Sequence, residues 1–155
     1  MLNLQKLHFG GDYNPEQWPK KVWAEDIRLM QKAGVNLVSL GIFSGANIER
    51  SEGVYDFSWL DEIIEMLHQG GISIDMATAT ASAPAWLTHK YPEVLPKNFD
   101  GVTLVHGGRQ AYCAASEVYR TKAAALVEKI AERYAKHPAV VMWHVNNEYG
   151  CHAPY

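Results

Sequence analysis

The sequence has little cysteine, almost no excess charge and no long apolar run, and each absence excludes a class of protein. Two cysteines in 155 residues are too few for a disulfide-stabilised secreted scaffold, so we expect a reducing cytoplasm. A net charge of -3 gives no electrostatic basis for binding nucleic acid or an anionic membrane. No segment has the length of a membrane span, and residues 1–6 lack the apolar core of a signal peptide. We therefore expect a cytoplasmic globular protein with neither nucleic acid nor membrane as a partner.

Several well-known functional motifs are also missing. Residues 9–12 do not form a dinucleotide fingerprint, and the sequence has no phosphate-binding Gly-Lys-Ser/Thr loop. It has no Gly-x-Ser-x-Gly elbow for a serine nucleophile. Cys113 and Cys151 lack the Cys-x-x-Cys spacing of a structural zinc site, and no histidine cluster completes four ligands. These absences direct attention to the carboxylates.

What the chain does contain is an alternation of short apolar runs and longer amphipathic segments. The apolar runs predict strands over residues 7–11, 35–40 and 72–78, and a further strand from Val140. The amphipathic segments predict helices over about 19–33, 58–69 and 117–136. Ser58 is the expected cap of the second helix, with Asp61 in a loose capping-box position. This order predicts a parallel sheet with right-handed crossovers.

The longest irregular segment, about residues 79–116, contains a predicted helical turn near 84–89. Loops of this length in compact domains are usually functional or disordered, and the aromatic content favours an ordered one. The chain is also too short for a closed barrel, which takes about 250 residues. We therefore expect an α/β fold, the N-terminal half of a (β/α)8 barrel with about four β-α units, and no second domain within residues 1–155.

The run from Val140 passes through two amides into Glu148 and stops at Gly150. In an α/β barrel the chemistry belongs at the carboxyl ends of the strands. A glutamate in that position, between aromatic residues and beside Asn147, combines the partial desolvation and the fixed hydrogen bonds that a general acid needs. The alternative interpretation is a solvated glutamate at a strand end.

Glycoside cleavage needs a second carboxylate, and we find no candidate with a setting like that of Glu148. Glu49 and Glu52 flank a turn, whereas Asp75 lies within a predicted strand. We therefore expect the second carboxylate to lie outside these residues. Arg109, on a glycine-rich loop, is a candidate ligand for sugar hydroxyls or for a carboxylate, with a surface ion pair as the alternative. Trp18 and Trp86 are candidates for stacking against a sugar ring.

Four long motifs now resemble glycoside hydrolase family 42 β-galactosidases. They are residues 9–19 (FGGDYNPEQWP), 52–61 (EGVYDFSWLD), 83–87 (APAWL) and 143–150 (WHVNNEYG). Their order and their spread over the whole chain make the resemblance specific. It implies a TIM-barrel catalytic domain, often in a homotrimer, that hydrolyses terminal β-D-galactosides, of the lactose or galacto-oligosaccharide type, with retention.

By motif, the resemblance makes Glu148 the acid/base, Asn147 its sugar-binding neighbour and Arg109 a further galactose contact. The family's nucleophile follows a later strand, outside residues 1–155, so we expect this chain alone to be inactive. The alternative is an inactive half-barrel that binds sugar weakly or associates with itself.

The resemblance requires no cofactor, although some members bind structural zinc through four cysteines. Cys113 matches the first of these ligands, whereas Cys151 follows Glu148 too closely to match the second, and the remaining ligands would lie past Tyr155. A further departure is Gly45, where the family usually has tryptophan. We expect its loss to loosen the packing of the loop after the second strand, or the sugar site.

Overall fold

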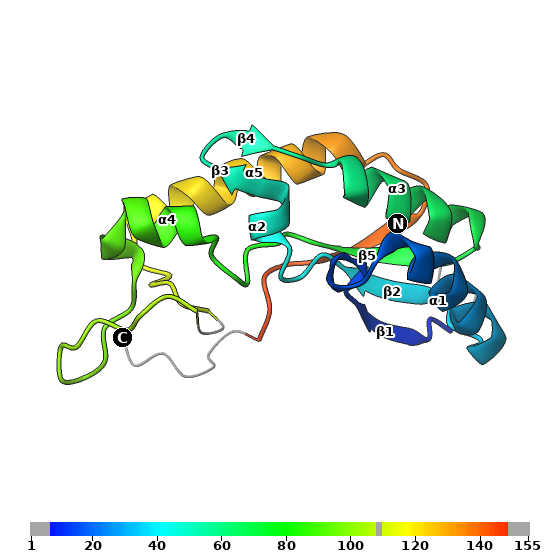
Figure 1. Cartoon of the computed structure of the whole chain (residues 1–155), viewed down its shortest axis with the longest axis horizontal. Helices are drawn as coiled ribbons and strands as arrows, with labels where there is room; N and C mark the ends of the chain where they lie inside the picture. Colours follow the sequence, from blue (N-terminus) through cyan, green and yellow to red (C-terminus); the bar gives the residue numbers. More distant parts are fainter. Residues whose placement is uncertain (1–6, 108–109, 149–155) are drawn as a thin grey trace.

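The computed structural model describes residues 7–107 and 110–148, and its centre is a four-stranded parallel sheet (Figure 1). The strands are β1 (Gly10–Tyr13), β2 (Leu37–Leu40), β5 (Ser73–Ala77) and β6 (Val140–His144), and they pair in this order. A separate antiparallel hairpin consists of β3 (Glu49–Ser51) and β4 (Val54–Tyr55). The predicted parallel sheet is therefore confirmed.

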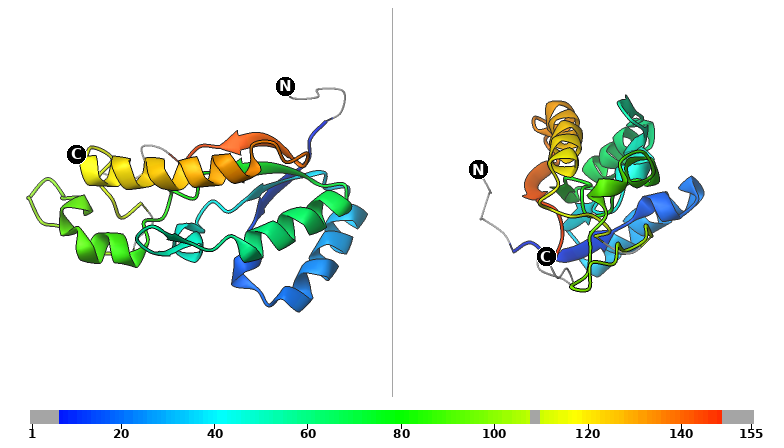
Figure 2. Two further views of the ribbon diagram at one scale, coloured as in Figure 1. Left: turned by 90° about the horizontal axis from the view of Figure 1, so that it is seen from above. Right: turned by 90° about the vertical axis from the view of Figure 1, so that its left-hand side faces the viewer.

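The three long helices join neighbouring strands of this sheet. They are α1 (Lys20–Ala33), α3 (Ser58–Gln69) and α5 (Glu117–Tyr134), and Gly34 ends α1 in the left-handed conformation. The short helices are η1 (Pro15–Gln17), α2 (Gly45–Ile48), α4 (Ala85–Lys90) and η2 (Pro92–Val94). Because right-handed crossovers follow one another in a single direction, the long helices lie on one side of the sheet, as in a barrel wall (Figure 2).

The two faces of the sheet differ in chemistry. The helix-facing side chains of the strands and their helix partners form one buried core: Val38, Leu40, Ile74, Met76, Trp23, Ile27, Ile63, Leu67, Leu126 and Ile130. Side chains alternate along a strand, so the intervening residues face the other way. Among them are Ser39, Asp75 and His144, which form a polar row on the face that would line the barrel interior.

The first strand begins later than expected. Its predicted start lies at Leu7, whereas β1 begins at Gly10. The preceding backbone instead binds the Asn36 side chain, whose Oδ1 accepts from Phe9 N at 2.9 Å and whose Nδ2 donates to Leu7 O at 2.9 Å. A side-chain clamp of this kind has no signature in hydrophobic periodicity, so the prediction was wrong by three residues.

The start of α3 also corrects a prediction. Ser58 is the first helical residue and not the cap, because the Asp56 carboxylate accepts its backbone N–H at 3.0 Å and its hydroxyl at 2.6 Å. Asp61 does not complete a capping box. Its carboxylate accepts hydrogen bonds from Arg133 and Tyr134, and so links α3 to the C-terminal end of α5.

The long loop after β5 is ordered in the described residues, as its aromatic content predicted. It contains α4 and η2, and a second buried cluster is made of Ala83, Leu87, Val94, Tyr112 and Tyr119. The rings of Tyr112 and Tyr119 stack with centroids 4.0 Å apart. This packing brings the end of the loop against the carboxyl ends of β5 and β6. No helix of the described part of the chain is long and apolar enough to cross a membrane.

Candidate active site

The candidate site is the turn that follows β6. The strand ends at His144, and Asn147 and Glu148 follow three and four residues later at the carboxyl edge of the sheet. Asn146 and Glu148 both adopt positive φ, 59° and 45°, which side chains other than glycine rarely do. Such conformations persist only where the surroundings hold them, and they gather at functional sites.

Asn146 is the buried anchor of this turn. Its backbone N–H donates to Thr78 Oγ1 at 2.9 Å, which ties it to the end of β5. Its side-chain amide bonds the Tyr112 hydroxyl, and its Oδ1 accepts from Asn147 N at 2.7 Å. Asparagine tolerates the left-handed region better than most residues, and here both the nitrogen and the oxygen of its amide make hydrogen bonds. The turn geometry is therefore set by buried hydrogen bonds.

Gln110 fixes the next two residues from the opposite side. Its Nε2 donates to Asn147 O at 2.5 Å and to Glu148 O at 3.0 Å. Gln110 also has a positive φ of 55°. It thereby binds the long loop to the turn that carries the two predicted site residues. Arg109, the predicted galactose contact, lies outside the described residues.

A row of hydrogen bonds leads to Asn147 across the inner face of the sheet. Asp75 Oδ2 accepts from Ser39 Oγ at 2.8 Å and lies 3.4 Å from His144 Nδ1. His144 Nε2 in turn lies 3.1 Å from Asn147 Oδ1. Asp75 is only 6% exposed, so the row begins in the interior of the sheet and reaches the surface at Asn147.

Glu148 itself is exposed in this structure, which differs from the expected partial desolvation. The reason is the position of β6 at the edge of the sheet, where no further strand covers the turn within the described residues. The structure brings Glu148 and Asn147 together at a strand end, as predicted, and Glu148 is an exposed residue there.

The other carboxylates considered as partners lie in structural settings. Glu52 accepts hydrogen bonds from Lys90, Tyr91 and Lys122, and so joins the hairpin to α4 and α5. Burial raises the pKa of Glu49, although a hydrogen bond from Gly53 N opposes that shift. Glu49 is buried in the hairpin and lines a pocket with Lys122 and Leu126 of α5. None of these residues supplies the second carboxylate of the candidate site.

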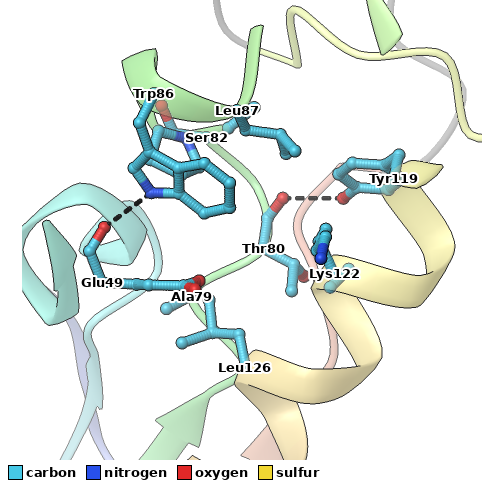
Figure 3. A pocket seen from close by; sticks show the side chains of 12 residues that line it. Glu49, Ala79, Thr80, Ser82, Trp86, Leu87, Tyr119, Lys122 and Leu126 are labelled. Atoms are coloured by element: carbon cyan, nitrogen blue, oxygen red, sulfur yellow. Dashed lines mark hydrogen bonds between the residues drawn. The ribbon is translucent and has the colours of Figure 1, made fainter. Parts of the chain in front are cut away.

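The backbone of Glu49 also binds Trp86, one of the two residues predicted to stack against a sugar ring. Trp86 lines a small pocket between the hairpin, α4 and α5, and its indole Nε1 donates to Glu49 O at 2.8 Å (Figure 3). The partly buried ring packs against the second buried cluster, which gives it a structural role, and stacking on a sugar ring stays a prediction. Trp18 is 59% exposed and remains open to a ligand.

Of the two cysteines considered as zinc ligands, one lies within the described residues. Cys113 is half-buried with a free thiol, and its backbone N–H donates to Val94 O at 2.7 Å. Cys151 lies beyond the described part of the chain. Among residues 7–107 and 110–148, no three metal-ligating side chains gather at one point. A role for Cys113 in structural zinc binding stays a prediction of the resemblance.

Sequence reasoning missed the residues that hold the turn: Thr78, Gln110, Tyr112, Asn146 and His144. Two of them could have been suspected, because Gln110 adjoins Arg109 and Asn146 adjoins Asn147. Thr78 and Tyr112 come from distant segments, and His144 ends the strand before the turn, so only the folded chain shows that they hold it.

Comparisons with known proteins identify the family of the chain. The profile of a family described as β-galactosidase, glycoside hydrolase 42, matches residues 12–155. A β-galactosidase, LacZ, of Heyndrickxia coagulans is 60% identical over 148 residues, which cover 96% of this chain and 22% of the relative. A second, bgaB of Geobacillus kaustophilus, is 57% identical over 149 residues, with the same coverage of 96% and 22%.

Solved structures show the same relationship. A β-galactosidase from Bacillus circulans sp. alkalophilus superposes with a TM-score of 0.91 at 47% identity, over 96% of this chain and 22% of that one. Gan42B, a family 42 β-galactosidase, gives 0.90 at 44% identity, over 95% and 22%. The expected fold, the N-terminal half of a (β/α)8 barrel, is thereby confirmed. The chain spans about 22% of the length of the relatives it matches.

Proposed function

This chain belongs to the glycoside hydrolase family 42 β-galactosidases, and from that premise we propose that it supplies the acid/base half of a retaining β-galactosidase. The substrate would be a terminal β-D-galactoside of the lactose or galacto-oligosaccharide type. The observation that carries the proposal is the turn after β6, in which Gln110 and Asn146 hold Asn147 and Glu148 at the carboxyl edge of the sheet.

Glu148 acts as the acid/base in this mechanism. Its carboxyl group protonates the glycosidic oxygen as the bond to the leaving group breaks, and later takes a proton from the attacking water. The second carboxylate attacks the anomeric carbon and forms the covalent intermediate. In retaining enzymes the two carboxyl groups lie about 5–5.5 Å apart. We expect that nucleophile outside residues 1–155, so the chain alone should not turn over substrate.

Asn147 and Arg109 position the sugar. An amide held by hydrogen bonds can donate to a sugar hydroxyl, and that bond strengthens as charge develops in the transition state. By the family resemblance, Arg109 would be a further contact to the galactose. The reaction requires no cofactor, and zinc at Cys113 would be structural in such an enzyme.

The complete protein would be a cytoplasmic homotrimer, and the ligand that it binds would be its β-galactoside substrate. A second candidate function is an inactive half-barrel that binds sugar weakly or associates with itself. The exposure of Glu148 and the unpaired edge of β6 among the described residues support this second candidate.

A chimera tests the proposal: residues 1–155 replace the matching segment of the Heyndrickxia coagulans relative. General acid assistance matters little for a leaving group that is already stable as an anion. We therefore expect Glu148→Ala to retain glycosylation by dinitrophenyl galactoside and to lose lactose hydrolysis, with azide rescuing the deglycosylation step. Asn147→Ala should lower kcat/KM for both substrates by a similar factor, on the order of 10²-fold.

The control is the isolated chain 1–155, which should show no turnover of nitrophenyl galactoside. Turnover by this chain that Glu148→Gln abolishes would refute the placement of the nucleophile. If azide fails to rescue Glu148→Ala in the chimera and both substrates lose activity equally, Glu148 is not the acid/base.

A further inference from the structure

We propose that His144 is a positioning residue for Asn147. Asp75, which accepts a hydrogen bond from Ser39, in turn holds His144. This inference rests on the proposed function, because it concerns how that site is kept in its working geometry. The starting point is that the four side chains come from β2, β5, β6 and the turn after β6, and meet in one row on the inner face of the sheet.

Strand register places the members of this row. Ser39 pairs directly with Asp75, and His144 pairs with Ala77, two residues further along the same strand as Asp75. Residues two apart in a strand share a face, so Asp75 and His144 are diagonal neighbours. The row therefore follows from backbone pairing.

The polarity of the partners gives the row a direction. His144 has a carboxylate oxygen of Asp75 at Nδ1 and the amide oxygen of Asn147 at Nε2. Both atoms accept hydrogen bonds, so each ring nitrogen of His144 has an acceptor within reach in this arrangement. The Oδ1 of Asn147 is then occupied, and its Nδ2 keeps two hydrogens to offer a sugar hydroxyl. His144 thus decides which end of the Asn147 amide faces the ligand.

Asp75 has the burial expected of an anchor. It is 6% exposed, and its Oδ1 has no hydrogen-bond partner among the described residues. A buried carboxylate is costly unless a cation or several donors compensate it, and Ser39 Oγ and His144 Nδ1 are the groups within reach of its Oδ2. The simpler interpretation is that His144 serves Asp75 alone and that Asn147 lies beside it without consequence.

Two substitutions of His144 separate these interpretations in the chimera described above. Glutamine extends far enough to present an amide near the Nε2 position, and so can still bond Asn147. Asparagine reaches only the Nδ1 position, and so keeps the Asp75 contact alone. We expect His144→Gln to retain most of kcat/KM, and His144→Asn to lower it by up to about 100-fold, since a small misplacement of a substrate contact costs that much.

A double-mutant cycle measures the coupling between His144 and Asn147, which a purely structural role of His144 would not produce. If His144 acts through Asn147, His144→Asn should cause no further loss of kcat/KM in an Asn147→Ala background. Asp75→Asn, which keeps the side-chain shape, should show the same coupling with a smaller loss. Melting temperatures of all variants are measured in parallel.

The outcomes are distinct. Equal losses from His144→Asn in both backgrounds, or equal activity of the Gln and Asn variants, would overturn the positioning role while the parental chimera remains active. An inactive parental chimera would instead contradict the proposed function, and with it this inference. Retention by Gln, loss by Asn and coupling to Asn147 together support it.

Discussion

At the scale of single residues, the candidate site depends on positions held in uncommon conformations. Gln110, Asn146 and Glu148 all have positive φ, as does Ala79 in the loop after β5. The hydrogen bonds of Thr78, Tyr112 and Gln110 keep the first two in place. Backbone that is set in advance does not have to be ordered when substrate binds, so the strain serves preorganisation.

Another feature at the scale of single residues is Glu52, whose carboxylate forms ion pairs with two lysines. Hydrogen bonds from Lys122 at 2.5 Å and from Lys90 hold the pKa of Glu52 at about 2, well below its usual value. A carboxyl group with a depressed folded pKa stabilises the fold above its unfolded pKa and loses that contribution as pH falls towards the folded one. The stabilisation should therefore disappear between about pH 4.5 and pH 2.

We predict that Glu52→Gln lowers the melting temperature of the chimera at neutral pH, and that its difference from the parent narrows as pH falls below about 4.5. Thermal unfolding of both proteins at several pH values measures this. Glu93→Gln, at an exposed position of η2, is the control and should leave the pH profile unchanged. A Glu52→Gln difference that stays constant across this range would contradict the assignment.

At the scale of elements, α2 shows how a small residue sets the approach of two segments. A Cβ on Gly45 would lie 2.7 Å from Ala79 O and 3.1 Å from Ser82 O, so the backbone of the loop after β5 closes directly on the helix. The expectation that Gly45 loosens this packing was wrong. The loop backbone occupies the space that a side chain would need.

We predict that Gly45→Ala destabilises the chimera by about 1–3 kcal/mol, the usual effect of overpacking. Gly11→Ala is the matched control, because a Cβ on Gly11 would meet nothing within 4 Å and Gly11 has no positive φ. Urea unfolding of the two variants measures the difference. Equal stability of Gly45→Ala and Gly11→Ala would show that the loop yields without cost.

At the scale of the whole molecule, the sheet has two open edges and one open face. Among the described residues, β1 and β6 each pair with one neighbour only, and the helices lie on a single side. Strand edges with free N–H and C=O groups pair readily with other chains. Several large apolar side chains are also exposed: Leu7, Phe9, Phe99, Val105 and Val145.

We predict that chain 1–155 produced alone associates with itself or precipitates, because the edge of β6 and this apolar surface lack cover. Light scattering at tens of micromolar should give a mass above 17.4 kDa. The chimera, in which the relative supplies the remaining barrel, is the control and should stay soluble. A sharp monomer mass together with a cooperative melt would contradict the prediction.

The sequence by itself determined the order of strands and helices, the parallel sheet and the placement of Glu148 and Asn147 after the fourth strand of that sheet. These follow from local periodicity, from glycines such as Gly34 and from motifs that stand in one stretch of chain. Local signals are present in the sequence because neighbouring residues cause them.

The tertiary structure alone decided which distant residues hold the site. Thr78, Gln110 and Tyr112 reach the turn from other segments, and Ser39 and Asp75 meet His144 only through strand register. The exposure of Glu148 and the close approach at Gly45 are likewise set by neighbours in space. Such contacts have no periodic trace in the sequence, because long-range packing creates them when the chain folds.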